Sequence, residues 1–208
     1  MPRRVDHQQR RAQLAAALVD IAATRGLKAV TMREVAAQGG VSLRQVQYYF
    51  ASKDELLDAT WKYLADRLTA RVVSRAAAVG KGLPPRTVLS VTLGAVLPVD
   101  DESRHDALAS AAFYATALTQ PGFADSAMQY PNALENFLAA EVRKGQSAGD
   151  IAASRDSAAE AALLLALTNG LTSSVLAGQR DAQRATALLE YHLDRLFTHR
   201  SGDRPPAG

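Results

Sequence analysis

Three helix-start patterns crowd into residues 31–55, and this crowding limits the local fold more than any other feature of the chain. In each pattern a Thr or Ser stands three residues before a Glu or Gln: Thr31 and Glu34, Ser42 and Gln45, Ser52 and Glu55. In such a capping box the hydroxyl accepts from a backbone N–H inside the helix, and the longer side chain accepts from the N–H of the cap residue. The segment is therefore predicted to form short helices that meet at steep angles.

Apolar residues and glycines around the first two boxes support this prediction. Val30 and Val35 bracket the first box at the spacing of a hydrophobic staple, and Val41 and Val46 bracket the second. A pair of glycines between the boxes stops the first helix and permits a turn with positive φ. The pattern indicates a helix-turn-helix.

The outward face of the second short helix carries side chains that suit DNA. Arg44, Gln45, Gln47 and Tyr48 lie off the face that Val46 turns inward. Arg, Gln and Tyr suit phosphates and base edges, and a helix-turn-helix places its second helix in the major groove. Taken one at a time, the valines are core residues and the charged side chains are ordinary solvated groups. Only their positions together favour DNA binding.

Charge is distributed unevenly along the chain. Residues 1–75 hold 13 Lys and Arg against 7 Asp and Glu, whereas residues 76–208 hold 11 against 14. A basic N-terminal third joined to a mildly acidic remainder suits a nucleic-acid-binding head on a body with another task. Four arginines near the start form either an arm that reaches DNA or a disordered, soluble terminus: Arg3, Arg4, Arg10 and Arg11.

From Leu14 to Ala59 the chain resembles the TetR family of bacterial transcriptional regulators. The matching residues are Ile21-Ala22, Gly26, Thr31, Val35-Ala36, Gly40-Val41-Ser42, Tyr49-Phe50 and Lys53-Asp54-Glu55-Leu56-Leu57. The resemblance implies an all-α fold of about nine helices. An N-terminal three-helix, helix-turn-helix DNA-binding domain would precede a larger helical domain for ligand binding and dimerisation. The expected boundaries are 1–52 for the head, 53–200 for the body and 201–208 for a disordered tail.

The resemblance also assigns DNA contacts. It implies phosphate contacts for Thr31 and Arg33 at the start of the second helix, and backbone contacts for Tyr49 and Lys53. The recognition helix would carry Ser42, Leu43, Arg44, Gln45, Gln47 and Tyr48. Many family members carry Tyr where this chain has Gln47; an amide there suits a base edge, with adenine as the candidate.

Glycines and prolines divide the rest of the chain into further helices. The expected ranges are 52–79, 85–97, 100–118, a helix to 144 that Pro131 kinks or restarts, 157–176 and 182–197, with a turn-rich connection over 145–154. The helix over 157–176 is apolar around most of its circumference and needs cover on more than one side. The last two helices therefore form either a core within one chain or, as the resemblance implies, a homodimer interface.

Four C-terminal segments resemble one branch of the family, named after the choline-responsive betaine regulator: residues 97–102, 145–151, 163–171 and 188–197. The branch is broad, so choline itself is not implied. The resemblance does imply a pocket inside the body for a small, largely apolar effector. The candidate lining residues, each of which is otherwise a core residue, are Trp61, Leu64, Phe113, Tyr114, Ala117, Met128, Phe137, Asn169 and Thr172. A polar amide inside an apolar helix needs a partner, which singles out Asn169.

The implied function is a repressor that binds a palindromic operator as a dimer and is released when a ligand moves the fourth helix. A non-specific DNA-binding protein is an alternative, although the acidic, apolar remainder argues against it. An α-helical enzyme is another, but the chain has no Cys and no HExxH, GxGxxG, GxSxG or P-loop pattern. No catalytic residue, cofactor or metal site is therefore expected. The absence of a signal peptide and of a long enough apolar span predicts a cytoplasmic protein without a membrane partner.

Overall fold

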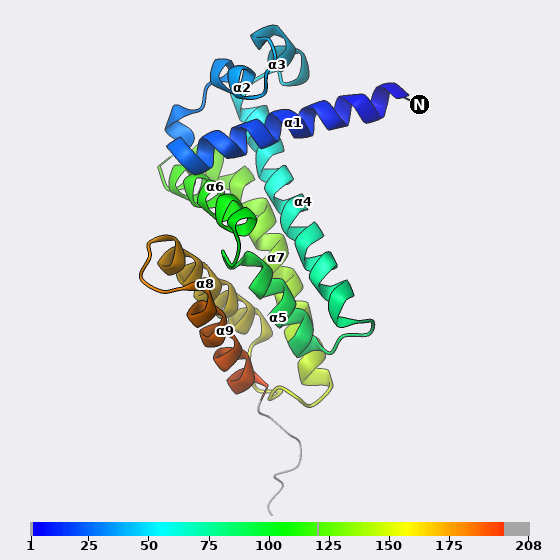
Figure 1. Cartoon of the computed structure of the whole chain (residues 1–208). Coiled ribbons are helices and arrows are strands. Elements are labelled where there is room, and N and C mark those ends of the chain that lie inside the picture. The colour runs from blue at the N-terminus through cyan, green and yellow to red at the C-terminus, as the bar shows by residue number, and fades with distance from the viewer. Residues whose placement is uncertain (1, 120, 198–208) are drawn as a thin grey trace, which may run out of the picture. The chain divides into compact units, whose positions relative to one another are not determined.

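The computed structural model describes residues 2–119 and 121–197. Over these ranges the chain is all-α, as expected, with nine α-helices and no strand (Figure 1). The bounds are α1 Pro2–Arg25, α2 Met32–Gln38, α3 Leu43–Tyr49, α4 Lys53–Val79, α5 Pro85–Val96, α6 Asp101–Ala117, α7 Pro121–Ser147, α8 Ser157–Leu176 and α9 Ala182–Leu196, with a short 3-10 helix, η1, at Leu27–Ala29. The expected tail over 201–208 and the side chains of Arg3 and Arg4 lie outside the described part of the chain.

The first two capping boxes form as the sequence predicts. At the start of α2, the Thr31 hydroxyl accepts from the Glu34 N–H and the Glu34 carboxylate accepts from the Thr31 N–H, both at 3.1 Å. At the start of α3, Ser42 and Gln45 exchange the same pair of bonds at 3.2 and 3.1 Å. Between the two helices Gly40 adopts a φ of 65°, a conformation that is strained for any residue with a Cβ. Two reciprocal caps and one glycine turn therefore fix the start of both short helices.

The third predicted box is only half formed. The Ser52 hydroxyl accepts from the Glu55 N–H at 3.1 Å, as expected. The Glu55 carboxylate, however, accepts from the N–H of Ala51 at 2.8 Å rather than from that of Ser52. Its other oxygen is held by Arg11 of α1, a partner that the local pattern does not include.

The chain folds into two compact units, each made of two stretches of sequence. Of the described residues, unit 1 comprises 2–69, 100–119 and 121–130, and unit 2 comprises 70–99 and 131–197. The core of unit 1 is shared by α1, α2, α3, the first half of α4, and α6. Leu14, Leu18 and Ile21 form the buried stripe of α1, and Phe113 joins them from α6. The short helix-turn-helix therefore stands on a core to which a much later helix contributes.

Polar contacts bind α6 to its neighbours in unit 1. His105 Nε2 lies 2.9 Å from Asp20 Oδ1 of α1, and the other Asp20 oxygen accepts from Gln38 of α2 at 3.3 Å. Arg67 of α4 donates from Nε to both oxygens of the buried Asp106, at 2.9 and 3.0 Å. Asp20 thus links α1 to both α2 and α6.

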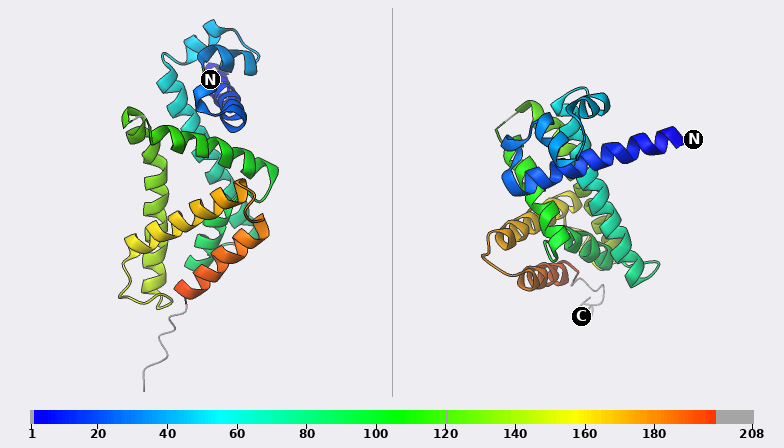
Figure 2. Two further views of the ribbon diagram at one scale, coloured as in Figure 1. Left: turned by 90° about the vertical axis from the view of Figure 1, so that its left-hand side faces the viewer. Right: turned by 45° about the horizontal axis from the view of Figure 1, so that its top comes forward.

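Unit 2 packs α5, α8, α9 and the second half of α7 around a separate core. Its fully buried side chains include Leu89, Leu93, Leu138, Val142, Leu164, Leu189 and Leu193. Helices α8 and α9 pack against one another, as two views of the ribbon show (Figure 2). Arg86 of α5 reaches α9, where it donates to Glu190 and Asp194 at 2.9 and 2.5 Å. These contacts hold α9 onto α5 within this unit.

Helix α7 ends later than predicted, at Ser147 rather than at residue 144. Of the two predicted effects of Pro131, a kink or a restart, the restart does not occur, because the helix continues through this residue. Gly145 therefore lies inside the helix and is not its stop signal. A Cβ at Gly145 would lie 2.8 Å from Ile151 Cδ1, so a larger residue there would require the Ile151 side chain to shift. The connection to α8 is shifted accordingly to residues 148–156.

Candidate DNA-binding site

The recognition helix α3 is anchored by one face and exposed on the other. Val46 and Phe50 are completely buried in the core of unit 1. Arg44, Gln47 and Tyr48 are exposed, and 75% of the Tyr48 surface is accessible. An outward surface of guanidinium, amide and phenol groups on a rigid base can reach both phosphates and base edges.

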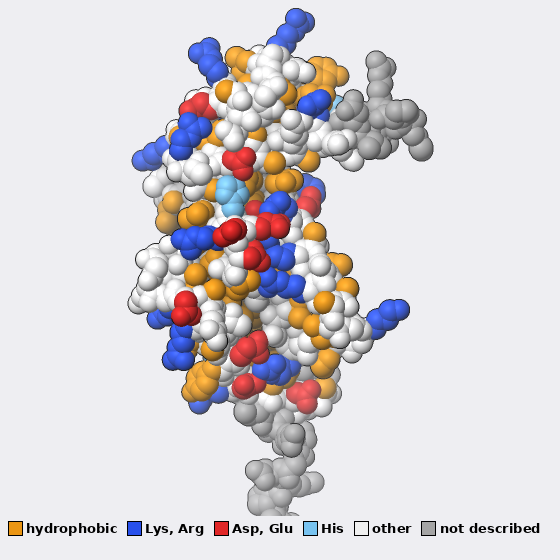
Figure 3. Space-filling model, viewed as in Figure 1, with side chains coloured by type: hydrophobic (Ala, Val, Ile, Leu, Met, Phe, Trp, Pro, Cys, Tyr) orange, Lys and Arg blue, Asp and Glu red, His pale blue; other side chains and the backbone are white. Residues whose placement is uncertain are grey.

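The other predicted DNA contacts of α2, α3 and α4 divide into exposed and partly committed groups. Thr31, Arg33, Ser42, Gln45 and Lys53 are exposed. Thr31, Ser42 and Gln45 also serve the helix caps, so part of their hydrogen-bonding capacity is already used. Lys and Arg side chains project from the surface over α2 and α3 (Figure 3). This surface is therefore positively charged where the recognition helix is presented.

Leu43 and Tyr49 are half-buried and contact the core of unit 1. The Tyr49 ring also contacts the rings of two neighbours, with centroid distances of 5.0 Å to Tyr48 and 4.8 Å to His7 of α1. His7 was not predicted as part of this surface. A sequence signal for His7 does exist: it lies on the same helical stripe of α1 as Arg11, Leu14 and Leu18, which faces the rest of unit 1. Leu43 thus serves packing in part, and Tyr49 sits in an aromatic cluster.

Arg10 and Arg11 lie within α1, so the alternative of a disordered terminus is wrong at these two positions. Arg10 bonds to Gln13 on the same helix. Arg11 turns instead toward α3 and α4, where it contacts Tyr49 and Glu55. Helix α1 extends this far because its buried stripe is covered by the rest of unit 1.

Six of the predicted ligand residues belong to unit 1: Trp61, Leu64, Phe113, Tyr114, Ala117 and Met128. Trp61 stacks on Phe113 with centroids 4.9 Å apart, and Tyr114 meets Trp61 edge-on at 5.7 Å. Trp61, Leu64 and Phe113 are buried, while the other three are half-buried. Burial raises the pKa of the Tyr114 phenol above its ordinary value of 10. The structure thus brings three of the predicted aromatic side chains into one stacked cluster.

The remaining three predicted ligand residues, Phe137, Asn169 and Thr172, belong to unit 2. Phe137 is 42% exposed, and Asn169 and Thr172 are half-buried. The Thr172 hydroxyl is buried without a hydrogen-bond partner, which makes it a second polar group of α8 that a ligand or another chain would satisfy. The nine predicted residues are therefore divided between the two units, six in unit 1 and three in unit 2.

Both halves of the chain match family models. Residues 14–60 match the model described as bacterial regulatory proteins of the tetR family, and residues 85–198 match that of the C-terminal part of BetI-type transcriptional repressors. The BetI regulator of Burkholderia mallei is 30% identical over 96% of this chain and all of its own length. The PksA regulator of Bacillus subtilis is 34% identical over 103 residues, which are about half of each protein.

The chain belongs to the TetR family. A TetR-family transcriptional regulator from Rhodococcus sp. is 24% identical, with a TM-score of 0.82 over 91% of this chain and 99% of that one. A transcriptional regulator from Saccharomonospora viridis, solved in complex with choline, is 21% identical with a TM-score of 0.75 over 93% and 97%. This TetR-family protein is accordingly a transcriptional regulator with a helix-turn-helix DNA-binding head and a BetI-type C-terminal domain, not an enzyme.

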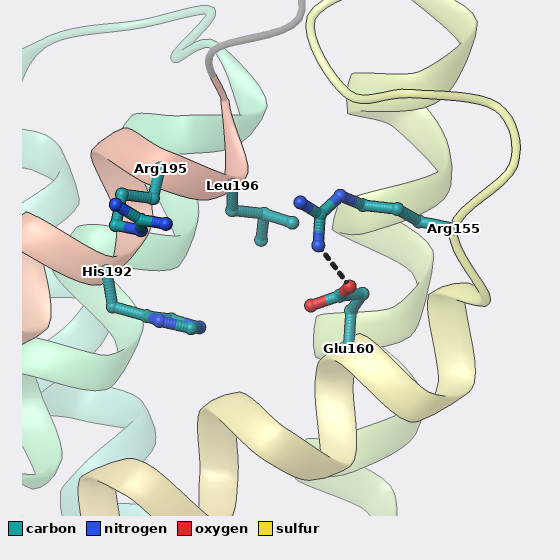
Figure 4. Close-up of a pocket in the computed structure, with 5 residues that line it drawn as sticks. All are labelled: Arg155, Glu160, His192, Arg195 and Leu196. Atoms are coloured by element: carbon teal, nitrogen blue, oxygen red, sulfur yellow. Dashed lines mark hydrogen bonds and ion pairs between the residues drawn. The ribbon is translucent and has the colours of Figure 1, made fainter.

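A cavity of about 480 Å³ lies between α8, α9 and the loop before α8 of this TetR-family regulator (Figure 4). It is lined by Arg155, Glu160, His192, Arg195 and Leu196. Arg155 donates to Glu160 at 2.6 Å, and the buried Nε2 of His192 has no hydrogen-bond partner. None of the predicted ligand residues lines this cavity, because it is polar whereas they were chosen for an apolar pocket. Among the described residues no three His, Asp or Glu side chains form a metal-binding group.

Helix α8 presents an uncovered face in unit 2 of the regulator. Leu163, Ala166, Gly170 and Ser173 are exposed at spacings of three and four residues, so they form one stripe. By length and composition alone α8 would be apolar enough to cross a membrane, a test that the core helix of a soluble protein also passes. The opposite side of α8 is buried within the unit and carries residues such as Leu164 and Leu171. Within unit 2, α8 is therefore covered on one side, and the stripe from Leu163 to Ser173 is left exposed.

Proposed function

We propose that this regulator represses transcription by binding a palindromic operator as a homodimer and dissociates when a small, largely apolar effector binds its body. The observation that carries the proposal is the recognition helix, which is anchored by Val46 and Phe50 and presents Arg44, Gln47 and Tyr48 outward. The proposed head spans residues 1–52 and the proposed body residues 53–200. The protein would act in the cytoplasm, where the operator DNA is.

The exposed stripe of α8 supports dimerisation. Small side chains let two helices approach closely, and Leu163, which is 59% exposed, would gain cover in such an interface. Tyr191 of α9, which is 60% exposed, would contribute a second apolar surface. Two-fold pairing through α8 and α9 would present two recognition helices to two half-sites of one operator.

Replacing Ala166 with arginine is expected to break this dimer. An unpaired charge buried at a two-fold interface costs about 3–5 kcal/mol, which corresponds to a dissociation constant raised by at least about 100-fold. The measurement is the molar mass by light scattering after size-exclusion chromatography. Ala153→Arg, at an exposed position in the loop before α8, is the matched control. A variant A166R that stays dimeric beside a dimeric parent would show that the interface lies elsewhere.

Effector binding would act on DNA binding through α4, which begins in unit 1 and ends in unit 2. Ligand and operator must then weaken each other by the same factor, typically about 1–3 kcal/mol. The proposed ligand contacts are the nine residues named above, of which Trp61, Phe113 and Tyr114 would have to part or reorient to admit a molecule. Choline, present in a structure of similar fold, is one probe to test beside apolar compounds.

The test of the proposed function is binding to the DNA that flanks the protein's own gene. Fluorescence anisotropy would compare this DNA with a scrambled duplex of equal length across a salt series. A regulator should prefer its operator by about 10³-fold or more, with two protomers or a multiple per site. Equal affinity for both duplexes, with a steep salt dependence, would favour the alternative of a non-specific DNA-binding protein. Loss of the complex on adding an effector would identify the ligand.

A further inference from the structure

Arg11 of α1 contacts the turn that joins the recognition helix α3 to α4. Its guanidinium donates to the backbone carbonyl of Tyr49 at 2.5 Å and to Glu55 Oε1 at 2.9 Å. The same group lies over the ring of Phe50, with its central carbon 4.2 Å from the ring centre. One side chain thus touches the last residue of α3, the buried residue that follows it, and the first turn of α4.

Glu55 completes the contact from the other side. While Oε1 accepts from Arg11, Oε2 accepts from the backbone N–H of Ala51 at 2.8 Å. The Glu55 N–H donates to the Ser52 hydroxyl at 3.1 Å. The hydrogen bond from Ala51, followed by that from Arg11, lowers the pKa of Glu55 below its ordinary value of 4.5, so the carboxylate is charged at neutral pH.

These bonds satisfy backbone groups that the short helix leaves open. The last carbonyls of any α-helix have no N–H donor within the helix, and the Tyr49 carbonyl is one of them. A helix of only seven residues, as α3 is, has little stability of its own and depends on tertiary contacts. The planar guanidinium can donate to a carbonyl and a carboxylate while its face lies over an aromatic ring.

We propose that Arg11 and Glu55 form a latch that sets the direction of the recognition helix, and that neither of them contacts DNA. Both are positioning residues, since they would act on the operator only through the Tyr49–Ser52 turn. The proposal rests in part on the proposed function, because it assigns the latch a role in operator recognition. It replaces the interpretation of Arg11 as an arm that contacts phosphate.

The variant Glu55→Gln separates the two interpretations by the sign of its effect. If charge alone mattered, removing a negative charge from the DNA-binding head would tighten operator binding. If the latch matters, binding should weaken by roughly tenfold, because a charge-assisted hydrogen bond is lost in each protomer. Asp58→Asn, one turn further along α4 and exposed, is the charge-matched control, and its affinity should stay equal to the parent's or rise slightly.

The salt dependence distinguishes a latch from a phosphate contact at Arg11. Arg11→Gln should weaken operator binding about as much as Glu55→Gln, and the double variant should be little weaker than either, since both changes break one unit. The slope of log Kd against log salt should not change in Arg11→Gln, because that slope counts phosphate contacts. A smaller slope would overturn the proposal.

Backbone hydrogen exchange provides a readout that does not need DNA. The amide of Ala51, bonded to Glu55, should exchange faster in Glu55→Gln and Arg11→Gln than in the parent or Asp58→Asn, with the thermal midpoint checked in each. Unchanged exchange in the two variants would overturn the latch even if the parent showed no operator preference. If the parent selects its operator and Glu55→Gln binds that operator equally well or better, the proposed latch is wrong but the proposed regulatory function is retained.

Discussion

Arg44→Ala is expected to remove most of the protein's preference for its operator over scrambled DNA. The Arg44 side chain is exposed near the start of α3, on the face opposite the buried Val46. A bidentate contact from such an arginine to a base pair contributes about 1–3 kcal/mol of discrimination, and a dimer would lose it at both half-sites. The measurement is the ratio of dissociation constants for operator and scrambled duplex at one salt concentration.

Two controls make the result for Arg44 specific. Arg143→Ala removes the same charge from an exposed site on α7 in unit 2 and should leave the ratio unchanged. Arg33→Ala, at the proposed phosphate contact on α2, should weaken binding to both duplexes by a similar factor and lower the salt slope. If Arg44→Ala behaved like Arg33→Ala, Arg44 would be a phosphate contact and the base would be read elsewhere on α3.

Phe113→Ala is expected to cause the largest loss of stability of the variants considered. The ring is completely buried, stacks on Trp61 and belongs to the core that unites α1 and α6. Truncation of a buried phenylalanine lowers the free energy of unfolding by about 3–5 kcal/mol, because contacts are lost and a cavity remains. Urea denaturation followed by circular dichroism would measure the change.

The comparison variant is Phe137→Ala on α7. Because Phe137 is 42% exposed, its truncation should lower the free energy of unfolding far less. The pair also tests whether Phe113 belongs to the ligand site or to the core. A loss of under about 1 kcal/mol at Phe113, together with abolished effector binding, would show that the ring lines a pocket with room to spare.

The two short helices of the helix-turn-helix could be predicted almost residue by residue because their signals are local. Capping boxes at Thr31 and Ser42 join residues only three apart, and both form. The third box failed in one half because Glu55 has a partner 44 residues away, and no local pattern could show that Arg11 would compete for it. The seventh helix was predicted to end at residue 144, before Gly145, but it continues to Ser147 and Ile151 packs closely against Gly145.

The ligand site could be predicted only as a list of residue types. Aromatic residues at helical spacing do not reveal whether they will be covered by another helix, and Phe113 became fully buried whereas Phe137 stayed exposed. The predicted residues also fall in both compact units, a division that the chain crosses at 69–70, 99–100 and 130–131. Because no residue pattern marks these crossings, a core and a pocket could not be told apart from the sequence.

Because unit 1 is made of two stretches of sequence, the DNA-binding head cannot be exchanged between proteins as one continuous segment. Helix α6, which begins at Asp101, supplies Phe113 to the same core as Leu14 and Leu18, and holds Asp20 through His105. A fragment that stops within α4 would expose to water the part of α1 that α6 covers. A chimera spliced once behind the third helix would pair one parent's α1 with the other parent's α6. Exchanging operator specificity between such regulators therefore means transplanting single side chains on α3, or carrying α6 along with the head.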